Sequence, residues 1–481
     1  MLFCTQDFLL FFVIVLAVYW AMPWQRARVY FLLGASFYFY ASWNAWLAGV
    51  IAASSTADYL FARGMDAACS PRRRRCLLGA SLSMNLGLLF YFKYANFFLQ
   101  SVEAALHAAG RTESLPLLRV ILPIGISFYT FEAISYTVDV YRRRIPAERN
   151  LAHFMLFILF FPHLVAGPIV RARDFLPQVR RRKRASWPRA HLGGRYILMG
   201  MFKKLVIADH MARFTEPVFA NPGQYRTSAL WIAAFAYALQ IYCDFSGYSD
   251  LALGAARLLG YRLAQNFNMP YLAANVTELW HRWHISLSTW LRDYIFFPLV
   301  RRGRQNRCPE CQRRRNYRAI LVTMTVCGLW HGANWTFVVW GALHGLLQIG
   351  HRVFRGFAET RPTLDRSLRT GPGTALRIAL TFVTWCLATV VFRSTSLGAA
   401  ATMLSRMMLP SNGLAHALPV AHVAWAGAVL LGCHLLAVRN TWQKVLESVP
   451  WPLRGLGYAG VLVTTIVLAP VTTQTFVYFQ F

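Results

Sequence analysis

The sequence is poor in charged residues, which make up only 14% of its 481 positions, against about 25% in an ordinary globular protein. A soluble core needs a charged surface around it, and this chain cannot supply one. Acidic residues are especially few: 19 Asp and Glu stand against 50 Lys and Arg, so the net charge is +31. Hydrophobic residues account for 56% of the chain. This composition excludes a soluble protein, and a mean hydropathy of +0.38 also argues against a nucleic-acid binder.

Motifs that would indicate several other classes are missing. The nine cysteines are scattered and form no disulfide framework. No P-loop, nucleophile elbow or glycine-rich dinucleotide fingerprint is present, so phosphate and nicotinamide chemistry lack their usual binding motifs. The N-terminus has neither the positive region nor the small-residue cleavage site of a signal peptide. We therefore predict that Met1–Ala21, whose single charge is Asp7, is a retained first membrane span.

Long apolar segments recur along the rest of the chain. A membrane-spanning helix needs about 20 apolar residues, and several segments are too long for one crossing, so we expect about eight to eleven spans. The segments are Val29–Ala53, Cys76–Leu99, Val120–Val140, Leu151–Val170, Ser228–Leu259, Ala319–Gly350, Leu376–Phe392, Val420–Val438 and Leu456–Val471. The sequence thus predicts an all-α fold, a multi-pass transmembrane helical bundle.

Basic runs separate the apolar segments. Loops rich in Lys and Arg lie preferentially in the cytoplasm, so we assign the basic runs to that side. The main basic cytoplasmic loops are then residues 171–195, 301–318 and 352–377. We predict one integral-membrane domain over residues 1–481, in which the excess positive charge mainly reflects topology.

Two apolar segments cannot be single crossings under this assignment. Leu151–Val170 and Ala319–Gly350 each begin and end at a basic run, so each must be a re-entrant pair or two short half-spans. The first contains Pro162, Gly167 and Pro168, which break a helix and suit a bent segment buried in protein. We therefore expect re-entrant helices around a central cavity.

The second of these segments carries a polar cluster, Trp330–Asn334, at its middle. If the segment is helical, His331 lies about 18 Å beyond Ala319, near the middle of the bilayer. Polar groups at that depth are costly and are functional candidates by default. Imidazole suits general-base chemistry near neutral pH, although a buried histidine is more often structural in a soluble protein.

The roles of three other residues in the same segment are predicted from their residue types. Gly328 and Gly332 would let a substrate or a backbone approach closely. His344, further along the expected helix, is predicted to be a packed histidine with a hydrogen bond.

Tryptophans and charged residues alternate over Asn268–Pro298. Such mixing fits an amphipathic helix at the membrane interface or a helix that faces a wet cavity. An interfacial anchor alone would account for the pattern. The other interpretation is that its polar residues face the reacting groups.

A zinc site is a weak alternative for the histidines of this region. His281 and His284 could pair with His331, but no cysteine or carboxylate helix motif accompanies them, so we predict no metal site. Cys308 and Cys311 lack a second pair of ligands, and we interpret their segment as an incidental insertion.

Two carboxylates, Asp244 and Asp250, lie near the end of another apolar run. They could orient a catalytic group, or they could pair with Arg282 or Arg292. Structural ion pairing explains them equally well.

Taken in order, these motifs resemble the membrane-bound O-acyltransferase superfamily, and most closely its bacterial alginate O-acetyltransferase-like branch. The resemblance spans most of the chain. It rests on Tyr91–Phe97, Leu122–Tyr129 with Phe131 and Glu132, Phe161–Pro168, Asp244–Asp250, Trp283–Tyr294, Gly328–Asn334 and Tyr478–Phe481. There are two departures: His281 stands where the alginate-type pattern usually has Arg, and Cys308–Cys311 is an extra segment.

The resemblance implies roles for individual residues. His331 matches the invariant histidine of the superfamily, and His284 matches a position where eukaryotic members usually carry Asn. We expect His331 to act as general base or proton shuttle, and His284, together with Asp244 or Asp293, to orient the thioester carbonyl. The residues expected to bind or orient the substrates are Asp244, Trp283, Ser288, Arg292, Asp293, Trp330 and Asn334.

The resemblance also implies the reaction and its setting. We expect an acyl group, with acetyl-CoA as donor, to pass from the cytoplasm to a hydroxyl for extracytoplasmic polysaccharide O-acetylation. No bound cofactor and no nucleic acid are expected. The expected partners are the bilayer of the inner membrane, a periplasmic acetyltransferase and exopolysaccharide machinery. The alternatives are D-alanyl transfer, lipid or protein acylation, and a proton-coupled transporter that uses the same buried histidines.

Overall fold

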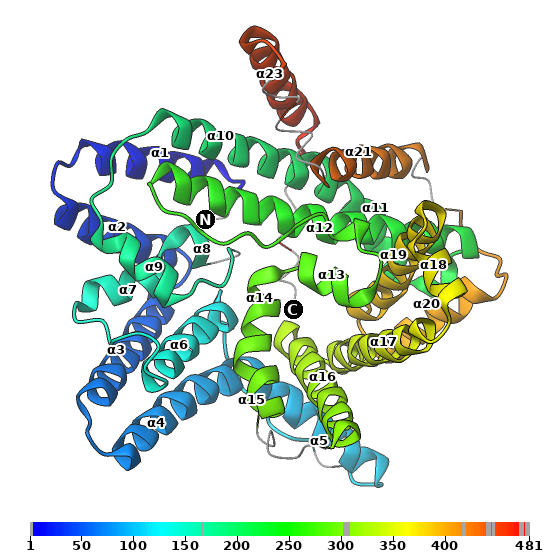
Figure 1. Cartoon of the computed structure of the whole chain (residues 1–481), viewed down its shortest axis with the longest axis horizontal. Coiled ribbons are helices and arrows are strands. Elements are labelled where there is room, and N and C mark those ends of the chain that lie inside the picture. Colours follow the sequence, from blue (N-terminus) through cyan, green and yellow to red (C-terminus); the bar gives the residue numbers. More distant parts are fainter. Residues whose placement is uncertain are drawn as a thin grey trace. The chain divides into compact units, whose positions relative to one another are not determined.

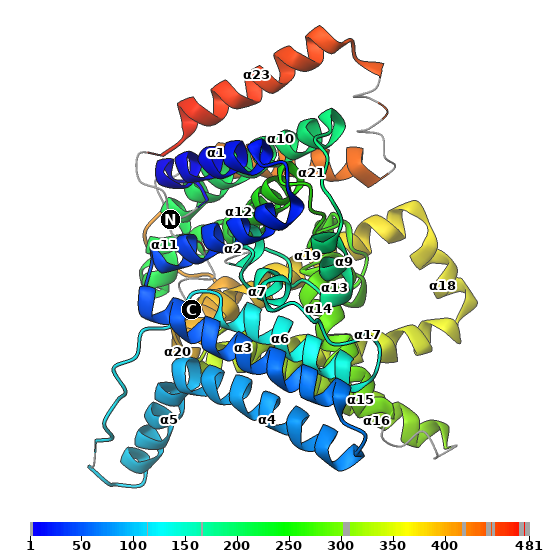
Figure 2. The same ribbon diagram turned by 90° about the vertical axis from the view of Figure 1, so that its left-hand side faces the viewer.

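The protein is helical throughout the part of the chain that the structure describes (Figures 1 and 2). The computed structural model describes residues 3–112, 114–164, 167–301, 308–415, 420–438, 444, 448–470 and 476. The matched motif at residues 478–481 and the start of the second large basic loop lie outside these ranges. Over the described residues the only β pairing is an isolated bridge between Tyr225 and Leu414. The all-α prediction is therefore confirmed.

The chain divides into two compact units, and it passes between them within α10, within α12 and between residues 264 and 265. Unit 1 comprises residues 1–197 and 248–264, and unit 2 comprises residues 198–247 and 265–481. The helices that begin in unit 1 are α1 (Gln6–Ala21), α2 (Gln25–Ala41), α3 (Ala45–Ala67), α4 (Pro71–Leu89), η1 (Phe90–Tyr94), α5 (Ala95–Ala108), α6 (Ile126–Tyr141), α7 (Leu151–Leu159), α8 (Phe161–Leu164), α9 (Ala172–Arg180) and α10 (Trp187–Met201).

Unit 2 holds the remaining helices. These are η2 (Phe202–Ala208), α11 (Asp209–Ala220), η3 (Pro222–Gln224), α12 (Thr227–Leu258), η4 (Pro270–Leu272), α13 (Val276–Arg282), α14 (Ile285–Leu291), η5 (Arg292–Phe296), α15 (Phe297–Arg301), α16 (Pro309–His331), α17 (Trp335–Glu359), α18 (Pro362–Arg369), α19 (Gly371–Arg393), α20 (Leu397–Met408), α21 (Val420–Val438) and α23 (Trp451–Leu468).

Five of the described helices are long and apolar enough to cross a membrane, and two shorter helices are apolar. This count, made on length and composition, is lower than the eight to eleven spans expected. Several helices carry ionisable side chains at buried positions, for example Asp58 in α3 and Glu132 in α6, and these residues lower a helix's mean hydropathy. The protein is a membrane protein.

In unit 1, helices α3, α4 and α6 lie side by side, as both views show (Figures 1 and 2). The buried carboxylate of Asp58 holds them together. It accepts a hydrogen bond of 2.6 Å from Ser81 Oγ and bonds of 3.0 and 2.8 Å from Asn85 Nδ2. Ser81 Oγ also lies 3.2 Å from Thr137 Oγ1 of α6. Because a buried polar group without partners is costly, this network fixes how the three helices pack.

The segment 151–170 is broken, as its proline and glycine residues predict. Helix α7 ends at Leu159, α8 covers only Phe161–Leu164, and the residues from 167 to 171 are not helical. The buried carboxylate of Glu132 accepts a bond of 2.8 Å from Val170 N and lies 3.2 Å from His163 Nε2. One side chain of α6 therefore holds both sides of the break.

Helices α16 and α17 form a closely packed hairpin, and its turn contains Gly332 and Asn334. Glycine allows this close approach, because a Cβ on Gly328 would lie 2.1 Å from Phe337 O. A Cβ on Gly341 would lie 2.3 Å from Met324 O. Small residues four apart on each helix are a common device for packing helices inside membranes. The segment is thus a pair of helices joined by a turn.

Much of the basic sequence is helical. The basic residues from 309 to 318 form the first turns of α16, and those from 352 to 369 lie on the end of α17 and on α18. Arginine is a good helix former, so a high density of Arg does not by itself indicate a loop.

Replacing Gly328 by Ala should lower the thermal stability of the protein, because the added methyl group overlaps the backbone of α17. Gly350→Ala is the matched control on α17, where a Cβ would meet nothing within 4 Å and Ala favours the helix by about 0.5–1 kcal/mol. The unfolding midpoint of the detergent-solubilised protein measures both. Equal midpoints for the two variants would contradict the proposed packing.

Candidate active site

His331 is the last residue of α16 and lies at the turn of the hairpin in unit 2. Its side chain is buried and is surrounded by aromatic rings. The ring centroids of Trp330, Trp340 and Phe392 lie 5.0, 5.2 and 5.3 Å from that of the imidazole, in near-perpendicular arrangements. Such a shell excludes water and strengthens every electrostatic interaction inside it.

The second predicted histidine lies close to the first. His284 is completely buried between α13 and α14. The Trp330 indole lies 5.8 Å from the His284 ring and 5.0 Å from the His331 ring, so a single indole contacts both imidazoles. Phe245 of α12 also contacts His284, with ring centroids 4.6 Å apart. The sequence predictions of His331, His284 and Trp330 therefore converge on one cluster.

The backbone at His284 is strained. Its φ of 42° and ψ of 54° are left-handed, a conformation that costs a residue other than glycine about 1–3 kcal/mol. Asn266 holds this turn from across the chain. Its carbonyl oxygen accepts a bond of 2.9 Å from Ile285 N, and its Oδ1 accepts one of 2.6 Å from Ser286 Oγ. Sequence analysis missed Asn266, because the contact joins residues 20 positions apart.

Asp244 has a different partner from the two arginines considered for it. Its carboxylate lies 2.8 Å from Lys204 Nζ, and the same Nζ lies 2.8 Å from Asp209 Oδ1. All three side chains are buried. Arg282 instead pairs with Glu278, at 2.8 Å. The lysine was missed because nothing in its own segment, Phe202–Ala208, distinguishes it from a cytoplasmic charge.

The other predicted site residues fall into two groups. Trp283 and Asn334 have packing or capping contacts. The rings of Trp283 and Trp385 pack at a tilt of 55°, with centroids 4.6 Å apart, and Asn334 Oδ1 accepts a bond of 3.0 Å from Thr336 N at the start of α17. Arg292 and Asp293 pair with each other, at 3.0 Å, in the π-helical turn η5.

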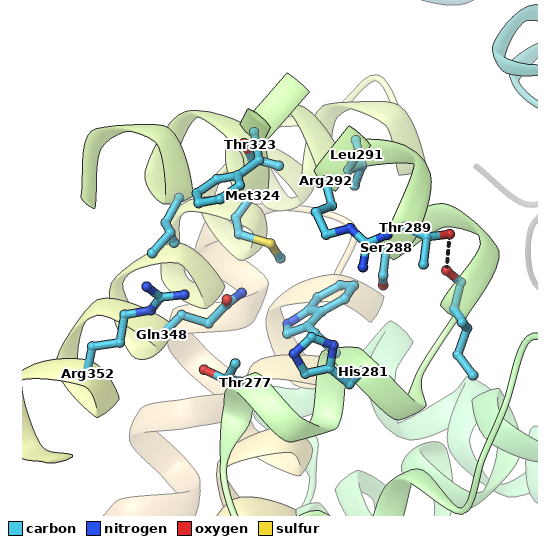
Figure 3. A pocket seen from close by; sticks show the side chains of 14 residues that line it. Thr277, His281, Ser288, Thr289, Leu291, Arg292, Thr323, Met324, Gln348 and Arg352 are labelled. Atoms are coloured by element: carbon cyan, nitrogen blue, oxygen red, sulfur yellow. Dashed lines mark hydrogen bonds between the residues drawn. The ribbon is translucent and has the colours of Figure 1, made fainter. Parts of the chain in front are cut away.

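A pocket of about 190 Å³ lies between α13, α14, α16 and α17, within unit 2 (Figure 3). Figure 3 shows Gln348 and Arg352 extending from one side and Ser288 and Arg292 from the other. The remaining lining residues are Thr277, Trp280, His281, Ile285, Thr289, Leu291, Phe296, Ile320, Thr323 and Met324. The pocket is smaller than the roughly 300–1,000 Å³ of most ligand sites, and Arg292 and Arg352 give it two positively charged groups.

One face of α17 leads from this pocket towards His331. Trp340, His344, Gln348 and Arg352 are four residues apart and therefore share a face. The Trp340 ring contacts His331 at 5.2 Å and contacts Trp280, a lining residue, at 5.8 Å. Through this pair of indoles, the wall of the pocket contacts the His331 ring. Gln348 and Arg352 were missed by sequence analysis, although their spacing of four from Trp340 could have indicated them.

His344 is a packed histidine, as predicted. It is buried, and Trp280 Nε1–H donates to its Nδ1 over 3.4 Å. Its ring lies 4.7 Å from that of Trp340.

The described residues contain no group of three or more His, Cys, Asp or Glu side chains that could hold a metal ion. Cys308 and Cys311 are exposed at the start of α16, where Cys311 N donates to Cys308 Sγ over 3.4 Å.

Sequence comparison connects this site to a reaction. The profile of the MBOAT, membrane-bound O-acyltransferase family matches residues 89–392. This range includes both histidines and every residue that lines the pocket. The chain belongs to the membrane-bound O-acyltransferase family. It is therefore an O-acyltransferase that needs an acyl donor, and its buried histidine cluster is the candidate active site.

The similar members of the family are named for related reactions. The chain is 40% identical to the probable alginate O-acetylase AlgI of Azotobacter vinelandii over 85% of its own length and 78% of that protein's length. It is 33% identical to the peptidoglycan O-acetyltransferase of Helicobacter pylori, over 78% and 73% of the two chains. The teichoic acid D-alanyltransferase of Bacillus subtilis is 26% identical over 56% and 68%.

His284→Asn should preserve folding and lower activity strongly, because Asn tolerates the left-handed conformation but lacks an imidazole. His284→Val should instead reduce folded yield, because a β-branched residue is poorly accommodated there. Size-exclusion yield and acyl-transfer rate of the two variants provide the comparison. A well-folded, fully active His284→Val would show that neither the turn geometry nor the imidazole matters.

Lys204→Met should destabilise the protein by about 3–5 kcal/mol, because it leaves two buried carboxylates without their cation. The triple change Lys204→Met, Asp209→Asn and Asp244→Asn should recover much of that loss. Unfolding midpoints in detergent measure the effect, and an unchanged midpoint for Lys204→Met would exclude a buried ion cluster.

Proposed function

We propose that the protein transfers an acetyl group from cytoplasmic acetyl-CoA to a hydroxyl acceptor for O-acetylation of an extracytoplasmic polysaccharide. The proposal rests on the position of the buried His331. The indoles of Trp340 and Trp280 connect its ring to a pocket that is lined by two arginines. The relatives named for alginate and peptidoglycan O-acetylation support acetyl as the transferred group and a polysaccharide as its destination.

The donor pocket suits a CoA thioester. Its walls include Trp280, Met324 and Ile320, which can contact a slender pantetheine arm, while Gln348 can hydrogen-bond an amide. Arg352 has no ion-pair partner among the described residues, and with Arg292 it would attract the CoA phosphates. The family's need for an acyl donor supports this assignment, and so does the combination of apolar and positively charged residues in the pocket.

The chemistry assigned to His331 is general-base catalysis. The imidazole removes the proton from the acceptor hydroxyl as its oxygen attacks the thioester carbonyl. A tetrahedral intermediate forms and collapses, the carbon–sulfur bond breaks, and the thiolate of CoA takes the proton back from His331. His284 would orient the thioester carbonyl, and the ring shell would keep water from hydrolysing the donor.

We further propose that the protein lies in the inner membrane and that its immediate acceptor belongs to the polysaccharide machinery. The acceptor is then a polysaccharide hydroxyl or a periplasmic acetyltransferase that passes the group onward. Nucleic acid has no part in this function. D-alanyl transfer, suggested by the more distant Bacillus relative, would use a carrier-protein thioester in place of acetyl-CoA.

His331→Ala should reduce acetyl transfer by about 10²–10⁴-fold, the usual contribution of a general base, and should leave membrane insertion and folding unchanged. Release of CoA thiol from acetyl-CoA by purified protein with acceptor measures the rate. His107→Ala, an exposed histidine of α5, is the control. Full activity of His331→Ala would refute the assignment of this histidine. If thiol is released only from a D-alanyl carrier-protein thioester, that thioester and not acetyl-CoA is the donor.

Arg352→Gln should raise the KM for acetyl-CoA about tenfold with little change in kcat, because it removes binding that is equal in ground and transition states. The wild-type KM should rise with salt, and that of the variant should rise less. Arg355→Gln is the matched control, since Arg355 is exposed and already pairs with Glu359 at 2.8 Å. An unchanged KM in Arg352→Gln would remove this arginine from the donor site.

A further inference from the structure

A second and larger cavity lies within unit 2 and plays no part in the proposed reaction. Its volume is about 650 Å³, within the roughly 300–1,000 Å³ of small-molecule sites. Its lining residues are Ile232, Phe235, Leu239, Tyr271, Ala375, Ile378, Ala379, Phe382, Val420, Val423, Ala424, Gly427, Leu430, Leu431 and His434. Apart from Tyr271 and His434, all of these side chains are apolar.

The three helices that form the walls of the cavity explain its size and indicate that it suits lipid rather than water. They are α12, α19 and α21, and all three are long and apolar enough to span a membrane. The cavity is open because small residues line it, notably Ala379 of α19 and Ala424 and Gly427 of α21. Val420 and Leu431 are 58% and 52% exposed, so the cavity reaches the lipid-facing surface. Water would find almost no hydrogen-bond partners there, whereas the chain of a membrane lipid would bury apolar surface.

His434 supplies one polar group with a defined requirement. Its side chain is buried, and its Nδ1 lies 3.0 Å from the Leu430 carbonyl oxygen. A carbonyl oxygen only accepts, so Nδ1 carries the proton and Nε2 of the neutral imidazole is an acceptor. This Nε2 has no hydrogen-bond partner among the described residues. A buried acceptor of this kind needs a donor, and an O–H group is the simplest one a lipid provides.

Aromatic rings separate this cavity from the histidine cluster. Tyr271 stacks on His434, with ring centroids 6.0 Å apart, and on Trp283, at 6.2 Å. The Tyr271 hydroxyl already donates to the Ala238 carbonyl oxygen. Trp283 directly precedes His284, so the rings form a wall on the side of the active site. This cavity is distinct from the pocket assigned to the donor, with which it shares no lining residue.

We propose that this cavity binds a membrane lipid with a free hydroxyl beside its acyl chain, of the diacylglycerol class. The chain fills the space between α12, α19 and α21, and the hydroxyl donates to Nε2 of His434. The site is separate from the acetyl-transfer function proposed above and does not depend on it.

Photo-crosslinking in phosphatidylcholine nanodiscs tests the proposal. The probe is a diacylglycerol with a diazirine on one acyl chain, and the comparison probe is the same molecule with its hydroxyl converted to a methyl ether. Mass spectrometry of the labelled peptides should locate the free-hydroxyl probe on α12, α19 or α21, with about tenfold more labelling than the ether. Equal labelling by both probes would mean that His434 does not recognise the hydroxyl, and it would overturn the proposal.

Variants of the full-length protein separate the chain from the hydroxyl. Gly427→Leu should fill the cavity and reduce labelling by both probes at least tenfold. Gly432→Leu, the same change on the same helix at a position that does not line the cavity, should label like the wild type. His434→Phe keeps a ring against Tyr271 and should abolish the preference for the free hydroxyl. If Gly427→Leu fails to fold, Ala379→Leu fills the cavity from α19.

Two further results would contradict the proposal: undiminished labelling in the folded cavity-filling variants, or a retained hydroxyl preference in His434→Phe. His331→Ala should label like the wild type, because the catalytic histidine lies outside this cavity. Loss of acetyl transfer in that variant with intact labelling would show that the two sites are independent.

Discussion

The close approach of α16 to α17 is the constraint on which the site depends. Gly328 and Gly341 bring the two backbones together so tightly that neither position has room for a methyl group. The hairpin thereby presents His331 at its turn and directs the Trp340 face of α17 along the pocket. Glycine is expensive in a helix, and its use at both contact positions is explained by this packing. Gly328 thus accommodates protein backbone, one of the two roles that the sequence allowed for it.

Two different kinds of interaction then support the histidine cluster. Around the imidazoles the contacts are aromatic: Trp330 contacts both His331 and His284, and Phe245 contacts His284. The charged groups form a separate cluster, in which Lys204 pairs with both Asp209 and Asp244. The strained turn at His284 is held by backbone and side-chain bonds from Asn266. An apolar shell with its charges outside suits a reaction in which a reactive thioester must be protected from water.

Sequence alone predicted the helical class, the break near Pro162 and the histidines of the cluster, because each follows from local residue types or motif spacing. It could not predict contacts between distant segments. Asp244 was matched with Arg282 or Arg292, which follow it by 38 and 48 residues, whereas its partner Lys204 precedes it by 40 residues, on η2. Asn266 was missed for the same reason. Arg352 was read only as one charge in a basic run, although its fourfold spacing from Trp340 places it on the pocket face.

The central claim is that His331 receives a donor from one membrane face and an acceptor from the other. Proteoliposomes with acetyl-labelled acetyl-CoA outside and an acceptor polysaccharide, with any required secreted acetyltransferase, sealed inside test it most directly. The account predicts labelled acetyl groups on the enclosed polysaccharide, no CoA inside, and no transfer in vesicles that contain His331→Ala. Acetylation only when donor and acceptor share one side of the membrane would contradict it.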